Sequence, residues 1–132
     1  LVVQRVGQDI FRDCLISYWQ GSCPLTGICD HALLRASHIK PWKDCESDED
    51  RLDVHNGLLL SALWDAAFDR GLVTFDDDGR PEFSKQLSEA AAAELRWQAP
   101  IHLTEKHRVH LEWHRSKVFE KGAAVAGSST IV

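Results

Sequence analysis

The stretch that most constrains the fold lies between residues 33 and 71, where strand and helix signals follow one another in a fixed order. An extended run leads into His38, and Pro41 stops its continuation. The polar, acidic segment 42–53 has the composition of a surface loop. Asn56-Gly57 then precedes the apolar run LLL, which predicts a turn into a second short strand.

A short apolar helix is expected next, in SALWDAAFDRG. Ser61 can cap its first turn, and Gly71 is well placed to end it. Asp65 and Asp69 stand four residues apart and therefore share one helix face, where two like charges destabilise a helix by a few tenths of a kcal/mol. A solvated surface would offset that cost, and so would a bound cation.

The flanking segments predict further helices and one hairpin. Residues 5–19 have the periodicity of an amphipathic helix, with one apolar stripe and two more apolar residues beside it: Val6, Ile10, Cys14 and Tyr18, then Phe11 and Leu15. The segment 72–83 predicts a hairpin, Ser88 can cap a helix, and Thr104 can cap a last helix with Val109 and Trp113 on one face. The fold class expected is α+β, in one domain over residues 1–121, with 122–132 a disordered tail.

Length and composition exclude several classes of protein. A chain of 132 residues has no apolar run near the ~18 residues of a membrane span, and its amino end lacks the features of a secretory signal. These absences favour a cytoplasmic protein with no membrane partner. Because the sequence starts at Leu1 and contains no methionine, we interpret it as a segment of a longer protein.

The net charge of −5 bears on nucleic-acid partners. Phosphate neutralisation supplies most of the affinity of non-specific DNA binders, so these are usually basic. If this domain acts on DNA, an additional DNA-recognition domain should hold it there.

The four cysteines are Cys14, Cys23, Cys29 and Cys45, and none forms the CxxC pair of a zinc ribbon. A chain of this size with a good core does not need disulfides, so we expect reduced thiols. Two disulfides or a structural zinc site are the alternatives.

Four residues whose side chains suit phosphodiester chemistry lie in the central segment. His38 ends the first strand, Asn56 follows 18 residues later, and Asp65 and Asp69 come nine and thirteen residues after Asn56. A strand pair packed on a helix would bring all four to one end of the unit. A histidine with a pKa near 6.5 is a natural general base at neutral pH.

This pattern resembles that of the HNH endonucleases, which have the ββα-metal fold. Ser37-His38 stand at the family's paired position, Asn56 at its asparagine, Asp65 at its third motif position and Asp69 at the last. The blocks RVGQDIFR, CPLTG, ASHIKPW, NGLLL, FDRGLVTFDDDG and HLEWHRSKVF look like a restriction-type branch of that superfamily, over roughly residues 5–120. The resemblance implies a ββα-metal core at about 33–71 with flanking N-terminal and C-terminal helices.

The resemblance also implies roles for these residues. His38 and Asn56 would be catalytic, and Asp65, Asp69 and Ser37 would stand at the metal site. Ser37 stands where the family usually has an acidic or histidine ligand, and Asp65 stands where the last histidine of the HNH motif is expected. Because oxygen ligands suit hard cations, these departures favour Mg²⁺ or Mn²⁺ over Zn²⁺.

The function expected is that of a metal-dependent HNH endonuclease domain that hydrolyses DNA phosphodiester bonds as the cleavage module of a restriction-type enzyme, with a homodimer as one arrangement for double-strand cutting. The alternatives are a ββα DNA-binding module that has lost catalysis, and a zinc-stabilised structural domain. Candidate DNA contacts are Arg70, Lys40, Arg5 and Arg12. His110 and His114 have a spacing that can bind metal, although we favour structural packing for both.

Overall fold

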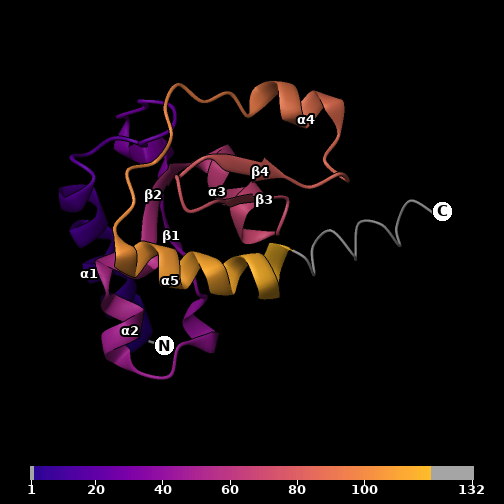
Figure 1. Cartoon of the computed structure of the whole chain (residues 1–132). Helices are drawn as coiled ribbons and strands as arrows, with labels where there is room; N and C mark the ends of the chain where they lie inside the picture. The colour runs from indigo at the N-terminus through magenta and orange to yellow at the C-terminus, as the bar shows by residue number, and fades with distance from the viewer. Residues whose placement is uncertain (1, 120–132) are drawn as a thin grey trace.

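The computed structural model describes residues 2–119, and the tail expected at 122–132 lies outside them (Figure 1). Its helices and strands are α1 (Val2–Tyr18), β1 (Leu34–His38), α2 (Asp48–Leu52), β2 (Gly57–Ser61), α3 (Ala62–Asp69), β3 (Val73–Phe75), β4 (Pro81–Phe83), α4 (Glu89–Glu94) and α5 (Glu105–His114). Short 3₁₀ turns are η1 (His31–Leu33), η2 (Trp42–Asp44) and η3 (Val54–Asn56), and α5 continues as the π-helical turn η4 (Arg115–Phe119). The α+β class predicted from the sequence is confirmed.

The centre of the fold is an antiparallel hairpin of β1 and β2 that is covered on both faces. Its register pairs Leu34 with Ser61 at one end and His38 with Gly57 at the other. Helices α1 and α3 both contact each strand, so the hairpin lies between them. All five residues of β2 are buried for this reason, and β1, β2 and α3 together form the predicted ββα unit.

The face of α1 that packs on the hairpin differs from the one we predicted. Phe11 and Leu15 are almost fully buried. Val6 and Ile10 instead remain 52% and 48% exposed, and Cys14 is exposed as well. The two stripes are adjacent and both apolar, and Phe11 belongs to the one that can pack flat against the hairpin.

Asn56-Gly57 was predicted to form a turn into the second strand; the turn is present and contains Asn56, but Gly57 lies in the strand. Gly57 is the first residue of β2, and its φ of −152° is ordinary extended backbone. A Cβ atom at this position would lie 2.4 Å from Cζ of Phe11, so the glycine provides room for that ring. The turn itself is made by η3, one residue earlier.

Helix α3 ends as the sequence predicts, at a glycine with left-handed backbone. Gly71 has a φ of +74°. Its N–H donates to the carbonyl of Phe68, and the N–H of Leu72 donates to that of Ala67, which is the hydrogen-bond pattern of a Schellman motif. Ser61 occupies the N-cap position of α3, but its side chain makes no capping hydrogen bond, contrary to our expectation.

Helix α5 contacts η3 and β3, and it runs below the β3–β4 hairpin in the view of Figure 1. Thr104 caps α5 through a capping box with His107. The residues that α5 buries are His107, Leu111 and His114, whereas Val109 is 61% exposed, so the face predicted around Val109 and Trp113 was wrong. Within residues 2–119, no helix is both long and apolar enough to cross a bilayer.

Candidate active site

The end of β1 places two adjacent side chains on opposite faces of the hairpin, because successive residues of a strand alternate. Ser37 faces α3, where its hydroxyl group donates a hydrogen bond to Oδ1 of Asp65. His38 faces α1, where its imidazole stacks on the ring of Phe11 with centroids 3.8 Å apart and planes 10° from parallel. The site therefore has two halves, one on each side of this strand end.

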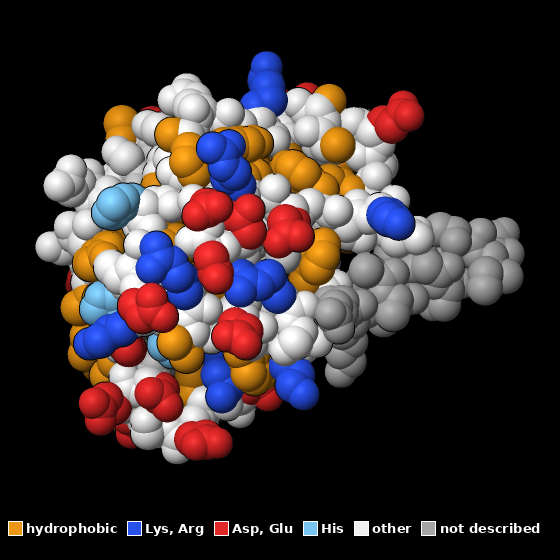
Figure 2. Space-filling view, in the orientation of Figure 1, with side chains coloured by type: hydrophobic (Ala, Val, Ile, Leu, Met, Phe, Trp, Pro, Cys, Tyr) orange, Lys and Arg blue, Asp and Glu red, His pale blue; other side chains and the backbone are white. Residues whose placement is uncertain are grey.

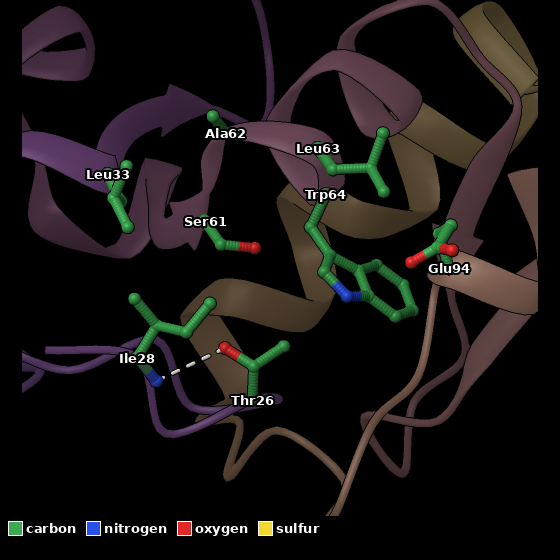
Figure 3. Close-up of a pocket in the computed structure, with 8 residues that line it drawn as sticks. All are labelled: Thr26, Ile28, Leu33, Ser61, Ala62, Leu63, Trp64 and Glu94. Carbon is green, nitrogen blue, oxygen red and sulfur yellow. Dashed lines mark hydrogen bonds between the residues drawn. The ribbon is translucent and has the colours of Figure 1, made fainter. Parts of the chain in front are cut away.

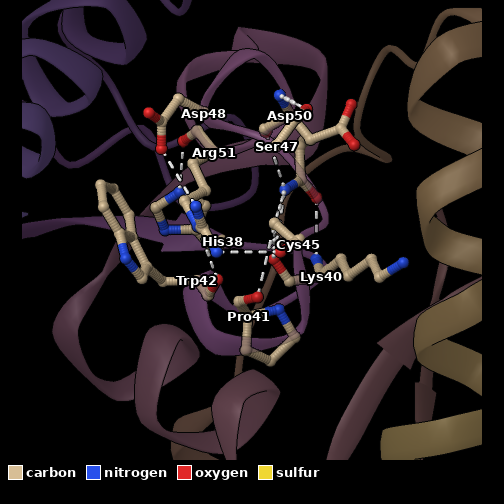
Figure 4. A network of polar contacts seen from close by, with 10 residues as sticks. His38, Lys40, Pro41, Trp42, Cys45, Ser47, Asp48, Asp50 and Arg51 are labelled. Carbon is tan, nitrogen blue, oxygen red and sulfur yellow. Dashed lines mark hydrogen bonds and ion pairs between the residues drawn. The ribbon is translucent and has the colours of Figure 1, made fainter.

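The imidazole of His38 is held by three contacts. Besides the stack on Phe11, the imidazole and the Trp42 ring form a T-shaped pair with a centroid distance of 5.9 Å. Its Nε2 lies 2.7 Å from the backbone carbonyl oxygen of Arg51 (Figure 4). A carbonyl oxygen can only accept, so Nε2 carries the hydrogen, and in the neutral ring Nδ1 must carry the lone pair.

Burial lowers the pKa of His38 below its ordinary value of 6.5, and the hydrogen bond to the Arg51 carbonyl partly opposes that shift. The neutral ring is therefore the main form at neutral pH. Among residues 2–119, no hydrogen bond to Nδ1 of His38 is present, so the lone pair of the neutral imidazole can accept a proton.

Asn56 holds the loop between β1 and β2 rather than the histidine ring. Its side chain is fully buried. Oδ1 accepts from the N–H of Lys40 at 2.8 Å, and Nδ2 donates to the carbonyl oxygens of Lys40 at 3.1 Å and Asp50 at 3.3 Å. The amide thus joins the beginning of the loop to its end, and only a side chain with both a donor and an acceptor can do so.

The carboxylate half of the site is formed by α3. Burial raises the pKa of Asp65, with a further contribution from the negative charge of Asp69, while the hydrogen bond from Ser37 and the charge of Arg35 oppose the shift. Asp69 is exposed. A cation between the two carboxylates would relieve both the burial cost and the repulsion.

These residues suit some metals better than others. Within residues 2–119, no three histidine, cysteine, aspartate or glutamate side chains converge to hold a metal ion. Two carboxylates beside a hydroxyl group nevertheless fit Mg²⁺, which is usually bound through one or two carboxylates and keeps several waters or takes phosphate oxygens. The group fits zinc less well, because zinc sites in proteins usually have three or four protein ligands that include histidine or cysteine.

The site residues predicted to meet at one end of the unit fall into two groups. Ser37, Asp65 and Asp69 gather on the α3 side, and His38 and Asn56 belong to the loop on the other side. Among the contacts of the described residues, no hydrogen bond or ion pair joins His38 to either aspartate. A phosphate would have to span the end of β1 to reach both groups.

The four candidate DNA contacts differ in their surroundings. Arg12 donates to the carbonyl oxygens of His31 and Leu34, both at 2.8 Å, so its guanidinium supports the start of β1. The ammonium group of Lys40 lies 5.3 Å from the centroid of the Trp113 ring. Arg5 and Arg70 are exposed.

On the face shown in Figure 2, acidic and basic side chains are interspersed, without a continuous basic patch. That pattern agrees with the net charge of −5.

The cysteines are all free thiols: Cys23 and Cys45 are buried, and Cys14 and Cys29 are exposed. Cys45 lies within the loop, where its Sγ is 3.4 Å from Nδ2 of Asn56.

Two of the C-terminal histidines have structural surroundings. His114 donates from Nε2 to the carbonyl of Phe68 at 2.9 Å, accepts at Nδ1 from the hydroxyl of Thr74 at 2.8 Å, and stacks on the Phe68 ring. Burial lowers its pKa to about 4. His110 donates from Nδ1 to the carbonyl of Lys106, one turn earlier. The pair at 110 and 114 therefore does not converge on a metal.

The sequence analysis missed a second histidine cluster, between η3 and α5. His55 donates from Nδ1 to Asp53 at 3.0 Å, and its ring centroid lies 5.1 Å from that of His107. His107 accepts at Nδ1 from the N–H of Thr104, so its Nε2 carries the hydrogen and has no lone pair for a metal. These residues are far apart in the sequence, and no spacing rule relates them.

A pocket of about 260 Å³ lies apart from His38, between the 23–30 loop, α3 and α4 (Figure 3). Its lining is mainly apolar, with Ile28, Leu33 and Trp64, and its one charged group is the carboxylate of Glu94. A pocket of that chemistry does not suit phosphate.

Residues 23–76 match the family described as HNH endonuclease. The matched segment runs from Cys23 through the ββα unit to the start of the β3–β4 turn. No curated protein matches the chain.

Proposed function

Starting from the HNH endonuclease segment at residues 23–76, we propose that this domain hydrolyses DNA phosphodiester bonds with the help of a divalent metal ion. The observation that carries the proposal is the hydrogen bond from Nε2 of His38 to the Arg51 carbonyl, since it leaves Nδ1 as the proton acceptor. HNH domains are generally metal-dependent nucleases, and the oxygen donors of Asp65 and Asp69 support Mg²⁺ or Mn²⁺ in this chain.

In this proposal His38 is the general base. Nδ1 takes a proton from a water molecule, the resulting hydroxide attacks phosphorus, and the bond to the 3′-oxygen breaks, after which the 3′-alkoxide takes a proton from solvent water. General base catalysis of this kind contributes about 10²- to 10⁴-fold. Phe11 and Trp42 restrict the ring so that Nδ1 keeps one direction.

Asp65 and Asp69 would hold the cation, and Ser37 would orient Asp65 through its hydrogen bond. When bound, the cation supplies charge neutralisation at the phosphate and the leaving oxygen. Asn56 would act by positioning, because its amide fixes the loop that carries the Arg51 carbonyl. Arg70 and Arg5 are the exposed candidates for phosphate contacts.

The biological setting is also part of the proposal. The mixed surface charge and the net charge of −5 support delivery to DNA by a separate recognition domain, as in a restriction-type enzyme. Cutting both strands at once would use two such sites, and a homodimer would supply them.

A second candidate function is a binding module that has lost catalysis, which is favoured by Ser37 at a position where the family has a ligand. Plasmid cleavage separates the two. The wild-type chain with Mn²⁺ or Mg²⁺ should nick or linearise plasmid DNA, and chelator should stop it. His38→Ala should lower the rate at least about 10²-fold, whereas His102→Ala, at an exposed histidine, should not.

Cleavage at the wild-type rate by a folded His38→Ala variant would remove His38 from the mechanism. If no metal supports cleavage by the wild-type chain, the binding module becomes the better description.

A further inference from the structure

Arg51, in the last turn of α2, folds its side chain back over the loop that precedes it (Figure 4). Its Nε donates to the carbonyl of Trp42, its Nη2 to the carbonyl of Cys45 and its Nη1 to the carboxylate of Asp48, each at 3.0 Å. The guanidinium also lies 5.5 Å from the centroid of the Trp42 ring. One side chain therefore connects η2, the loop after it and the first turn of α2.

These three bonds are not equal in strength. The Asp48 side chain is 85% exposed, and an ion pair at such a position contributes little to stability. The carbonyl oxygens of Trp42 and Cys45 matter more for fixing the loop, because among the hydrogen bonds described no other side chain donates to them. A planar guanidinium can donate in three directions at once, which a lysine ammonium on a flexible stem cannot reproduce.

The same residue contacts His38 through its backbone. The carbonyl of Arg51 accepts from Nε2 of His38 at 2.7 Å. Trp42, whose carbonyl accepts from the guanidinium of Arg51, forms a T-shaped ring pair with the imidazole. Two of the three contacts of the imidazole thus depend on how the Arg51 side chain fixes this loop. Asn56 adds a separate connection in the same loop, through its hydrogen bonds with the backbone of Lys40 and Asp50.

We propose that Arg51 is a positioning residue for His38: its side chain fixes the 42–51 loop so that its own carbonyl holds the histidine in the Nε2–H tautomer with Nδ1 free. The catalytic part of this role rests on the function proposed above for His38. The geometric part does not, because it concerns only which nitrogen carries the hydrogen.

The chain offers a closely matched control in Arg108. Its Nε also donates to a backbone carbonyl, that of Asp77, its Nη2 to the carbonyl of Leu103, and its Nη1 to a carboxylate three residues earlier, Glu105. Arg108→Lys therefore removes the same kind of contacts as Arg51→Lys, but from a part of the chain that does not touch His38.

The test uses ¹⁵N NMR of the imidazole nitrogens together with cleavage kinetics. The signals of His38 are identified by their absence in His38→Gln. In the wild-type chain and in Arg108→Lys, Nε2 should be protonated and Nδ1 not. In Arg51→Lys, and in Arg51→Gln, His38 should populate both tautomers. The kcat of these two variants should fall about 10- to 100-fold, the range expected when a reacting group is misplaced by up to an ångström, with KM little changed.

Several outcomes would overturn the proposal. One is a wild-type His38 with its hydrogen on Nδ1, which needs no variant and holds even if both Arg51 variants fail to fold. Another is an unchanged Nε2–H tautomer in folded Arg51 variants, whatever their kcat. Failure of the proposed function would look different, because the tautomer would still respond to Arg51 while His38→Gln cleaved DNA at the wild-type rate.

Discussion

The hydroxyl group of Ser37 donates a hydrogen bond to the carboxylate of Asp65, across 28 residues of sequence. Ser37 is buried, and burial together with Asp69 raises the pKa of Asp65, so the carboxylate keeps its charge at a cost in this position. That cost is the physical basis for the metal site we propose.

Asp65→Asn should weaken the binding of Mn²⁺ severely while leaving the protein as stable in chelator, or a few tenths of a kcal/mol more stable, because the repulsion by Asp69 is removed. The amide can still accept from Ser37, so the local packing is retained. Calorimetric Mn²⁺ titration and thermal melts of both proteins test this. Asp9→Asn, at an exposed position of α1, is the control. An unchanged Mn²⁺ affinity would remove Asp65 from the metal site.

Asn56→Ala should destabilise the fold by about 2–4 kcal/mol, because it removes a fully buried amide and the hydrogen bonds that this amide makes with the backbone of Lys40 and Asp50. Asn56→Asp keeps the shape and the acceptor but cannot donate to the two carbonyls, so it should be destabilised as well. Urea unfolding at neutral pH measures both. A loss below about 0.5 kcal/mol in Asn56→Ala would contradict the assignment of this amide as the main connection across the loop.

Gly57→Ala should be destabilised by about 1–3 kcal/mol, since the added Cβ would overlap the Phe11 ring. Replacing the Phe11 ring by the smaller leucine should relieve this overlap. The loss of unfolding free energy caused by Gly57→Ala should therefore be smaller in a Phe11→Leu background than in the wild type. If the two changes simply add, the glycine does not act through Phe11.

Acid should destabilise the protein through two buried histidines. Burial lowers the pKa of both His107 and His114 to about 4, against about 6.5 in an unfolded chain. Between these values the unfolded state binds protons that the native state does not, so the free energy of unfolding falls as the pH drops from 6.5 towards 4. The loss should be about 2 kcal/mol for each ring by pH 5.

His107→Gln introduces a side chain that suits this position of the capping box but does not titrate. The free energy of unfolding of this variant should therefore fall less between pH 7 and pH 5 than that of the wild type. Urea unfolding in chelator at the two pH values gives the slopes. Equal slopes for the wild type and this variant would show that His107 is not buried in its neutral form.

The isolated chain should bind duplex DNA weakly, with a Kd no lower than the ~10⁻⁴ to 10⁻⁶ M of non-specific contacts at physiological salt. Fluorescence anisotropy with the His38→Ala variant avoids cleavage during the measurement. Nanomolar binding would overturn the proposal that another domain delivers this one to DNA.

The order of elements in the ββα unit could be predicted from the sequence because each boundary has a local cause. Pro41 stops an extended segment, and Gly71 adopts the left-handed backbone that ends α3. The face of α1 could not be predicted in this way. Two apolar stripes lie side by side on that helix, and the choice between them depends on the ring of Phe11 meeting Gly57 and His38, which are distant in the sequence.

The site was predictable only where side chains carry the chemistry. His38, Asn56 and the two aspartates stand out by residue type and spacing. Arg51 does not, because its acceptors are backbone carbonyls and its own contact with His38 is through a carbonyl, which every residue possesses. Ser37 and His38 face opposite sides of the hairpin because successive residues of a strand alternate. The expectation that all site residues meet at one end of the unit did not take this alternation into account.

The sandwiching of the β1–β2 hairpin has a consequence for where this domain can be divided. The segment that matches the family starts at residue 23, yet Phe11 and Leu15, which cover one face of the hairpin, come from α1 before it. On the other side of the match, His114 of α5 holds the carbonyl of Phe68 in α3. The segment that matches the family is thus smaller than the packed unit, and a fragment trimmed to 23–76 would lose the Phe11 ring on which the imidazole of His38 stacks.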